Sequence, residues 1–380
     1  MPYCDHNATA PLRPEARKAV ERALSLTGNP SSFHAGGRAA RALAEEAREA
    51  VARLAGAKPE AVIFTSGATE ANALALRGAV EASRDAGKPI ARLLVSAIEH
   101  KSVLKTAEAI AERISDIRLE IVPVTADGVV DIEALTALLH GEGRALVAVM
   151  AANNETGVIQ PIAEISRLCR EVGALLLVDA VTAAGKIPLD AGLCDYMTLS
   201  GHKLGAPQGV GALIVSDAAP LVAQMVGGGQ QKGLRAGTEN LSGIAGFGAA
   251  AKAVLANDDE CTRVATLRGD FERALKRALP EAMILGEDAP RLPNTSNVAL
   301  PGLSAENIVI ALDLDGVMVS SGSSCSSGKI AASHVLAAMG KGDLSSIRVS
   351  FGWNSSREDA DAVVASLVKL WQRARPRAAA

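Results

Sequence analysis

Leu175-Leu176-Leu177-Val178-Asp179-Ala180 is the stretch that decides the fold of this chain. A run of apolar residues that ends in a carboxylate is typical of a buried strand. A second apolar run, residues 196–199, is followed by Ser200-Gly201-His202-Lys203. Ligand-binding groups gather at the carboxyl ends of the strands in an α/β sheet. We therefore expect Asp179 and Lys203 to lie on neighbouring strands at one edge of a sheet.

An amine and a carboxylate in this arrangement suit pyridoxal phosphate (PLP). Partial burial lowers the pKa of a lysine, so that its amine can attack a carbonyl. A carboxylate such as Asp179 could keep the pyridine nitrogen of the cofactor protonated. In the alternative reading, Lys203 is a solvated lysine at a strand end and Asp179 is a helix cap. These two residues alone leave both readings open.

The remaining sequence predicts an α/β fold with a mostly parallel sheet. Near-continuous apolar strands alternate with amphipathic helices, as expected of a sheet covered on both faces. The strands are expected at residues 61–64, 93–96, 119–124, 145–151 and 175–178. The expected helices include those at residues 162–172, 258–279 and 330–339. Residues 196–199 and 210–215 leave no room for a helix between them, so we expect an antiparallel pair there. We predict a large domain over residues 13–256, and a smaller α+β domain made of residues 1–12 and 257–380.

Composition and charge exclude several classes of protein. The chain has 380 residues, a net charge of −3 and a pI of about 6.1, which gives no electrostatic reason to bind nucleic acid or an anionic membrane. No secretory signal or membrane-spanning run is visible. The five cysteines are dispersed and none has CxxC spacing, so neither a disulfide framework nor a structural zinc site is expected. These features predict a cytoplasmic protein.

Two further turns could bind polar groups of a ligand. Residues 65–69 join a strand to a helix, and the helix N-terminus there could bind a phosphate together with Ser200 and His202. A simple helix cap is the alternative. Asn154 follows the strand at 145–151 and could donate a hydrogen bond to a phenolate oxygen or to a substrate carboxylate. A turn built on asparagine and glycine would also explain it.

Three more side chains carry chemistry. His100 follows a strand and could stack on a pyridine ring and move protons near neutral pH, although a histidine in such a place is more often structural. Arg348 lies in the apolar run 347–351 and could bind a substrate carboxylate; an internal salt bridge is the alternative. Cys325 lies in residues 320–328, nine residues of serine, glycine and cysteine, where we expect an exposed thiol on a flexible segment.

The chain resembles the cysteine desulfurases of the NifS/IscS type, class V aminotransferase-like enzymes with the type I PLP-dependent transferase fold. The resemblance covers nearly the whole length. It rests on motifs that occur in one order, among them YCDHNATAPLRPEA (3–16), FTSGATEANALALRG (64–78), IEHKSVL (98–104), NNETGVIQPI (153–162), VDAVTAAGK (178–186), SGHKLGAPQGVGAL (200–213), GLRAGTEN (233–240), SSGSSCSSGK (320–329) and IRVSFGW (347–353).

The resemblance implies a role for each of these residues. Lys203 carries PLP, Asp179 holds the pyridine nitrogen and His100 is the stacked acid/base. The phosphate is held by Ala68, Thr69, Ser200, His202 and, from the partner subunit of a homodimer, Thr238. Asn154 contacts the phenolate oxygen or the substrate, and Arg348 binds the carboxylate of L-cysteine. Thr182 stands where family members usually have glutamine, which leaves the tuning of the cofactor ring open.

The implied reaction converts L-cysteine to L-alanine and leaves the sulfur as a persulfide on Cys325. The acceptor would be an iron–sulfur scaffold or another sulfur-acceptor protein. No resident metal is expected, although Cys325 could transiently ligate a nascent iron–sulfur cluster. The alternatives are a class V aminotransferase, which has no use for the thiol, a selenocysteine lyase, and a regulator of the same fold that lacks catalysis.

Overall fold

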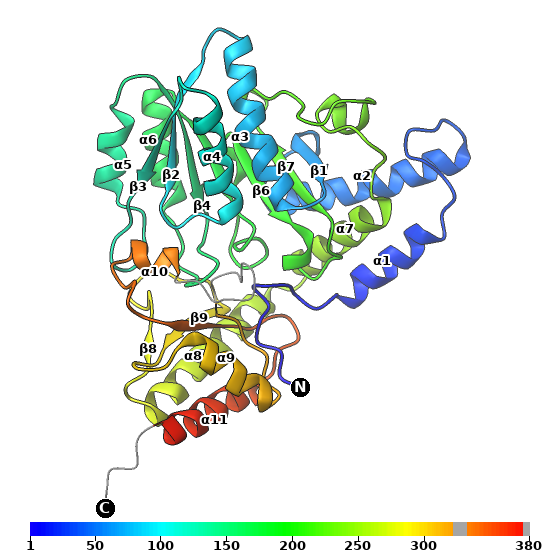
Figure 1. Ribbon diagram of the computed structural model, residues 1–380. Coiled ribbons are helices and arrows are strands. Elements are labelled where there is room, and N and C mark those ends of the chain that lie inside the picture. Colours follow the sequence, from blue (N-terminus) through cyan, green and yellow to red (C-terminus); the bar gives the residue numbers. More distant parts are fainter. Residues whose placement is uncertain (322–332, 375–380) are drawn as a thin grey trace, which may run out of the picture.

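Seven strands form the larger of two sheets in the computed structural model, which describes residues 1–321 and 333–374 (Figure 1). The strand order is β1-β7-β6-β5-β4-β2-β3. The strands are β1 Val62–Thr65, β2 Ile90–Ser96, β3 Arg118–Val122, β4 Arg144–Met150, β5 Leu175–Asp179, β6 Tyr196–Ser200 and β7 Gly211–Val215.

The directions of these strands confirm the predicted fold class. Strands β6, β5, β4, β2 and β3 run parallel to one another, and each of the crossovers from β2 to β5 contains a helix. β7 runs antiparallel to β6, as the short connection between them predicts, and β1 is antiparallel to β7. In the register of β5 and β6, Asp179 is paired with Thr198. The carboxyl ends of β5 and β6 therefore lie side by side.

Helices cover both faces of this sheet, because its strands are apolar on both sides. Helices α3 (Ala68–Asp85) and α4 (Lys101–Arg113) pack on one face (Figure 1). The other face is covered by α2 (Ala35–Ala55), α5 (Ile132–Leu139), α6 (Ile162–Val172) and α7 (Leu241–Leu255), and α1 (Pro14–Leu24) lies against α7. Short 3₁₀ turns occur at η1 (Pro59–Ala61), η2 (Ala191–Leu193), η3 (Gly201–Lys203) and η4 (Gln230–Gly233).

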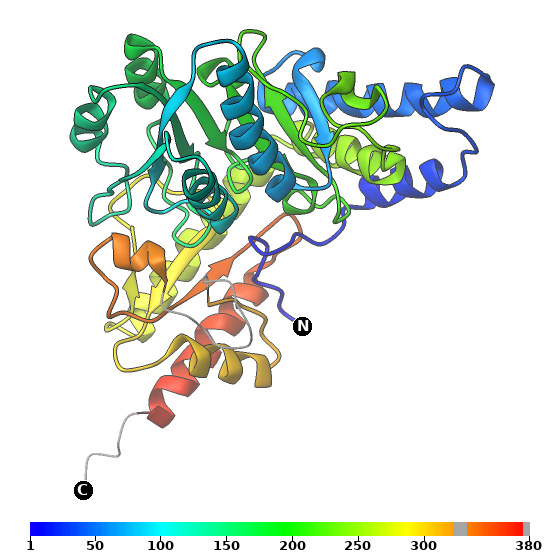
Figure 2. The same cartoon turned by 45° about the horizontal axis from the view of Figure 1, so that its top comes forward.

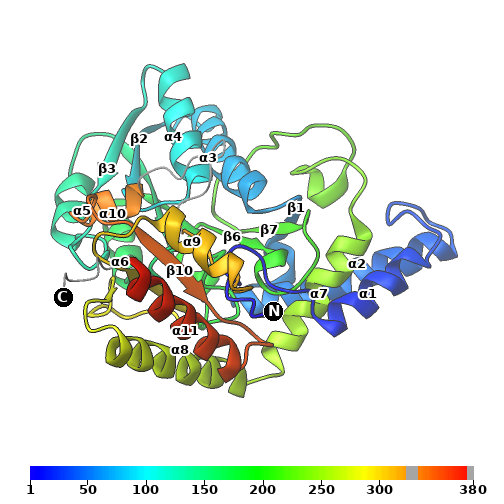
Figure 3. The ribbon, with the colours of Figure 1, turned by 60° about the horizontal axis from the view of Figure 1, so that its bottom comes forward.

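The smaller sheet is antiparallel, with the order β10-β9-β8. Its strands are β8 Met283–Ile284, β9 Thr295–Ala299 and β10 Ser346–Ser350. Helices α8 (Asp259–Ala278), α9 (Ala305–Leu314) and α11 (Arg357–Ala374) lie against it, and Figure 3 shows them on the same side of the molecule. They enclose a separate apolar core in which Phe271 and Phe351 meet edge to face, 5.6 Å between ring centroids.

The N-terminal segment crosses from the smaller sheet to the larger one (Figure 2). Cys4 is fully buried in the smaller core, and Asp5 pairs with Ser350 beside β10. Further along, the backbone N–H of Ala10 donates to the carbonyl of His202, 2.8 Å. The predicted division of the chain, with residues 1–12 joined to 257–380, stays a prediction.

Two sequence predictions fall partly outside the described residues. The helix expected at 330–339 is observed as α10 (His334–Ala338), and residues 330–332 lie outside the described part of the chain. Cys325 also lies outside it. In the two described ranges, no helix is both long and apolar enough to cross a bilayer.

Candidate active site

One cavity of about 610 Å³ opens at the carboxyl ends of the central strands. Its wall combines residues from the turns after β1, β2, β4, β5 and β6 with residues from the N-terminal segment and β10. Ten of the residues singled out from the sequence line it: Ala68, Thr69, His100, Asn154, Asp179, Thr182, Ser200, His202, Lys203 and Arg348. The fold thus brings together side chains that are spread over 280 positions of the chain, from 68 to 348.

Lys203 ends the 3₁₀ turn that follows β6. Its Nζ donates to the backbone carbonyls of Asn7 (2.5 Å) and Ala8 (2.8 Å). Burial and then the positive charge of Arg348 lower the pKa of the amine to about 8, against smaller opposing contributions from Asp5 and Asp179. A substantial fraction of this amine is therefore neutral at physiological pH.

Asp179 is the last residue of β5, and its carboxylate is buried with two hydrogen bonds. Oδ1 accepts from the backbone N–H of Val181, 3.0 Å, and Oδ2 accepts from Nδ2 of Asn72, 3.0 Å. The Asn72 side-chain oxygen in turn accepts from the hydroxyl of Thr198, 2.8 Å. These bonds fix the direction of the carboxylate without neutralising its charge.

His100 caps the N-terminus of α4 and faces the cavity. Its Nδ1 lies 3.1 Å from the backbone nitrogen and 2.8 Å from the hydroxyl of Ser102. Surrounding protein partly desolvates the ring, although the residue is exposed on the cavity side, and this lowers the pKa of His100; Asp179 acts in the opposite direction. The ring is thus mainly neutral near pH 7.

The N-terminus of α3 lies at another part of the wall, with Ser66, Gly67, Ala68 and Thr69 lining the cavity. The first N–H groups of a helix have no intrahelical acceptor and lie at its positive dipole end. The ring of His202 stands on the same wall and makes a 3.2 Å hydrogen bond with the Thr9 hydroxyl. Burial and the Lys203 charge lower the pKa of His202 to about 4, so it is neutral. This set of neutral donors suits an anion.

Arg348 lies on β10, and its side chain is buried beside the N-terminal segment. Nη2 forms an ion pair with Asp5, 2.8 Å, and Nη1 donates to the carbonyl of Asn154, 3.0 Å. The internal salt bridge considered from the sequence is therefore present. Nε is buried and has no partner among the described residues. The guanidinium is held rigidly and still has an unmatched donor.

Two predicted site residues remain, Thr238 and Cys325. Thr238 is exposed and does not line the cavity. Its predicted contact is with a partner subunit, so it stays a prediction. Cys325 lies outside the described residues. Thr182 does line the wall; it is buried, and its carbonyl accepts from Nζ of Lys186, 2.7 Å.

The sequence reasoning missed the residues that hold the predicted ones in place. Asn7 provides a carbonyl to Lys203 and is itself held by Thr295 and Asn294, 2.8 and 2.9 Å. Asp5, Asn72 and Ser102 were likewise not singled out. All four lie inside the motifs quoted above, which was the only signal that could have identified them.

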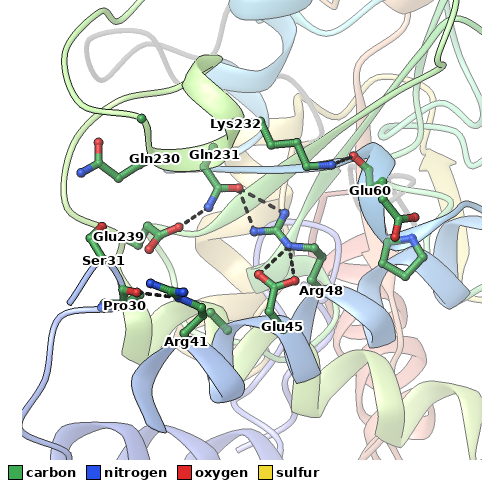
Figure 4. Close-up of a pocket in the computed structure, with 13 residues that line it drawn as sticks. Pro30, Ser31, Arg41, Glu45, Arg48, Glu60, Gln230, Gln231, Lys232 and Glu239 are labelled. Atoms are coloured by element: carbon green, nitrogen blue, oxygen red, sulfur yellow. Dashed lines mark hydrogen bonds and ion pairs between the residues drawn. The ribbon is translucent and has the colours of Figure 1, made fainter. Parts of the chain in front are cut away.

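A second cavity, of about 540 Å³, lies between α2 and η4 (Figure 4). None of the predicted site residues lines it. Arg48 is bound there by Glu45 and Gln231, and the Gln231 amide bonds Glu239. These polar groups therefore bind one another.

The chain belongs to the aminotransferase class-V family, whose model matches residues 2–363. Within that family it is similar to the NifS- and IscS-like cysteine desulfurases. A cysteine desulfurase of Cereibacter sphaeroides is 43% identical over 89% of this chain and 86% of that protein. An IscS-like cysteine desulfurase of Mycobacterium tuberculosis is 38% identical over 99% and 97%. The X-ray structure of a NifS-like protein from Rickettsia africae has a TM-score of 0.87 at 32% identity, over 98% of this chain and 99% of that one.

The family implies PLP as the cofactor, and the residues of the larger cavity fit it. The fit rests on the chemistry of the polar groups: a lysine amine of lowered pKa, a buried carboxylate and a cluster of neutral donors at a helix N-terminus. Lys203, Asp179 and the α3 N-terminus would hold its aldehyde, pyridine and phosphate ends. The bound group would supply an electron-withdrawing ring next to the substrate Cα.

The lowered pKa of Lys203 predicts unusual reactivity in the cofactor-free protein. Labelling of Lys203 by an amine-specific reagent is expected to reach half its maximal rate near pH 8, about 2.5 pH units below a free lysine. Because the Arg348 charge lowers this pKa, an Arg348→Leu variant should move the midpoint to higher pH. Peptide mapping of labelled protein across pH 6–11 measures both. A wild-type midpoint near pH 10 would contradict the prediction.

An Asp179→Asn variant is expected to have a steady-state catalytic rate at least about 100-fold lower than that of the wild-type protein. An amide can still accept from Val181 N–H, but it removes the negative charge that faces the cavity. Asp190→Asn is the matched control, because Asp190 also accepts from a backbone N–H, that of Gly192 at 2.8 Å, and lies outside the cavity. Steady-state rates and melting temperatures are compared, and equal losses in the two variants would refute a specific role.

Proposed function

We propose that this protein is a PLP-dependent cysteine desulfurase that supplies sulfur for iron–sulfur cluster assembly. L-Cysteine and the thiol of Cys325 react to give L-alanine and a Cys325 persulfide. The C–S bond of the substrate breaks, an S–S bond forms, and the two thiol protons end on the alanine methyl group and the persulfide. The reaction is balanced and needs no external oxidant or reductant.

The observation that carries the proposal is the shared wall of Lys203 and Arg348. The guanidinium is close enough to lower the pKa of the amine. An α-amino acid needs a cation for its carboxylate and a proton acceptor for its Cα–H. The two side chains provide these functions in one cavity, with Arg348 fixed by Asp5 and by the carbonyl of Asn154.

Each residue of the wall has a separate task. Arg348, which lines the cavity, orients the amino acid through its carboxylate. Lys203, neutral in part near pH 8, takes up and returns the proton at Cα. His100 donates a proton or hydrogen bond from another part of the wall, and Asp179 keeps a negative charge in the cavity.

The remaining cysteines support Cys325 as the thiol that receives the sulfur. Burial raises the pKa of Cys4, Cys169 and Cys194 to about 12, and burial also raises the pKa of Cys261. The thiolate is the nucleophilic form. None of these four therefore has appreciable thiolate at neutral pH, and none lines the candidate active site. Cys325, in its run of serine and glycine, is left for that task.

The purified protein is expected to release alanine and sulfide in equal amounts from L-cysteine in the presence of a thiol reductant. Alanine is measured by chromatography and sulfide by methylene blue formation. A class V aminotransferase would instead form a keto acid, and a selenocysteine lyase would act on selenocysteine in preference to cysteine. A regulator without catalysis would give neither product. Alanine absent from the mixture would overturn the proposed function.

The destination of the sulfur and the homodimer are separate parts of this proposal. The resemblance of the segment 320–329 to desulfurases that pass sulfur to a scaffold supports direct transfer. Radiolabelled sulfur from L-cysteine is expected on an iron–sulfur scaffold protein after mixing. Sedimentation is expected to give a homodimer, and Thr238→Ala is expected to weaken PLP binding if that residue contacts the partner's phosphate site. Sulfur found only on small thiols would remove the scaffold from the proposal.

A further inference from the structure

The hydroxyl of Ser102 lies between two side chains that serve the candidate active site. It is 2.8 Å from Nδ1 of His100, in the cavity wall, and it accepts from Nδ2 of Asn72, 3.0 Å, which is buried behind the wall. The backbone N–H of Ser102 also points at Nδ1, 3.1 Å. Among the described residues, His100 is thus held only at Nδ1, and its Nε2 has no hydrogen-bond partner there.

The direction of these bonds follows from what each group can donate. A backbone N–H can only donate, so Nδ1 of His100 must accept and carries no proton in the neutral ring. The Asn72 amide already donates to the Ser102 oxygen, which leaves the hydroxyl proton for Nδ1. The proton of the neutral ring is therefore on Nε2.

Asn72 fixes the arrangement of these hydrogen bonds, because its amide group can form them in only one orientation. Its two N–H groups reach the carboxylate of Asp179 and the hydroxyl of Ser102, 3.0 Å each. Its oxygen accepts from Thr198, 2.8 Å. A carboxylate only accepts, so the amide cannot be reversed. The side chain has no exposure to solvent.

We propose that Ser102 and Asn72 are positioning residues that hold His100 as the neutral Nε2–H tautomer and fix its orientation relative to Asp179. A ring held in this way presents a donor to the cavity. It can be protonated only at Nδ1, which opposes the backbone N–H of Ser102 and breaks the hydrogen bond from the hydroxyl. The task of the ring is therefore to donate rather than to act as the base. The assignment of His100 as a donor rests on the proposed function and deepens it in one respect. It leaves Lys203 as the one group that accepts the proton from Cα.

Charges on several elements face the same ring. Asp179 on β5 favours the imidazolium, whereas Lys203 in η3, His334 on α10 and Lys101 on α4 disfavour it. Burial and the charges of Lys203 and Lys101 lower the pKa of His100, as the Ser102 hydrogen bonds to the neutral ring also do. The hydroxyl of Ser102 can be removed by a single small substitution that leaves these charges in place.

The tautomer is tested first, in wild-type protein with ¹⁵N-labelled histidine, both loaded with PLP and cofactor-free. The His100 signals are assigned by their loss in His100→Gln. The expected result is an unprotonated Nδ1 and a protonated Nε2 at neutral pH. A ring protonated on Nδ1 would overturn the proposal. This measurement involves no turnover. The tautomer can therefore be contradicted while the desulfurase activity is confirmed, and the activity can be contradicted while the tautomer is confirmed.

The second test removes the hydroxyl. Ser102→Ala is expected to raise the pKa of His100 by a few tenths of a unit to about one unit, because one hydrogen bond to the neutral ring is lost. Ser102→Thr, which keeps the hydroxyl, should restore the wild-type titration, and the exposed Ser115→Ala is the matched control. The acid limb of kcat/KM should move with the ring titration. An unchanged His100 titration in Ser102→Ala would refute the role of the hydroxyl.

Discussion

Replacing Lys203 with alanine is expected to reduce cysteine turnover by about 10³-fold or more. General acid–base groups contribute 10²–10⁴-fold, and Lys203 also carries the cofactor in the proposed reaction. The release of alanine and the release of sulfide should fall together, because both require removal of the proton at Cα. The visible absorbance of the cofactor bound to lysine should also disappear, while PLP still binds through the α3 N-terminus.

Lys105→Ala is the control for this variant. Lys105 is exposed on α4 and pairs with Glu108 at 2.5 Å, away from the cavity. Its removal should change neither the absorbance nor the rate. Turnover within tenfold of wild type in Lys203→Ala would mean that another base acts at Cα. Since Ala replaces a side chain whose Nζ bonds two carbonyls of the N-terminal segment, the melting temperature must be recorded for both variants.

A Cys325→Ala variant is expected to separate substrate activation from sulfur transfer. It should bind PLP and L-cysteine, and it should exchange the Cα proton of cysteine with deuterated water at a rate near wild type. Persulfide, sulfide and alanine should all be lost, because the thiolate that attacks the substrate sulfur is missing. We expect the loss in product formation to be at least about 10³-fold.

Cys261→Ala is the matched control, since Cys261 is a free, partly exposed cysteine whose thiol contacts the carbonyl of Gly185, 3.5 Å. It should keep its activity. Deuterium exchange is followed by mass spectrometry of recovered cysteine, and persulfide by alkylation and peptide mapping. Sustained sulfide release by Cys325→Ala would refute the role of this thiol. Loss of deuterium exchange as well would show that the substitution damaged the active site itself.

The strands and most helices could be predicted because their signals are periodic and local. The helix expected at 162–172 is observed over the same residues, and that expected at 258–279 is α8, Asp259–Ala278. The antiparallel pair β6 and β7 followed from a connection too short for a helix. The edge strand β1 was predicted as a strand, but its antiparallel pairing with β7 was not, because pairing between distant strands leaves no local signal.

For the candidate site, the sequence located the chemical groups and the tertiary structure decided their partners. Lys203, Asp179 and His100 follow apolar strands, and a parallel sheet necessarily carries such residues to one edge. The ion pair of Arg348 with Asp5 joins residues 343 positions apart, and the bond of Lys203 to Asn7 spans 196. Such bonds depend on how one element packs against another over a few ångströms, and a one-dimensional pattern does not record that distance.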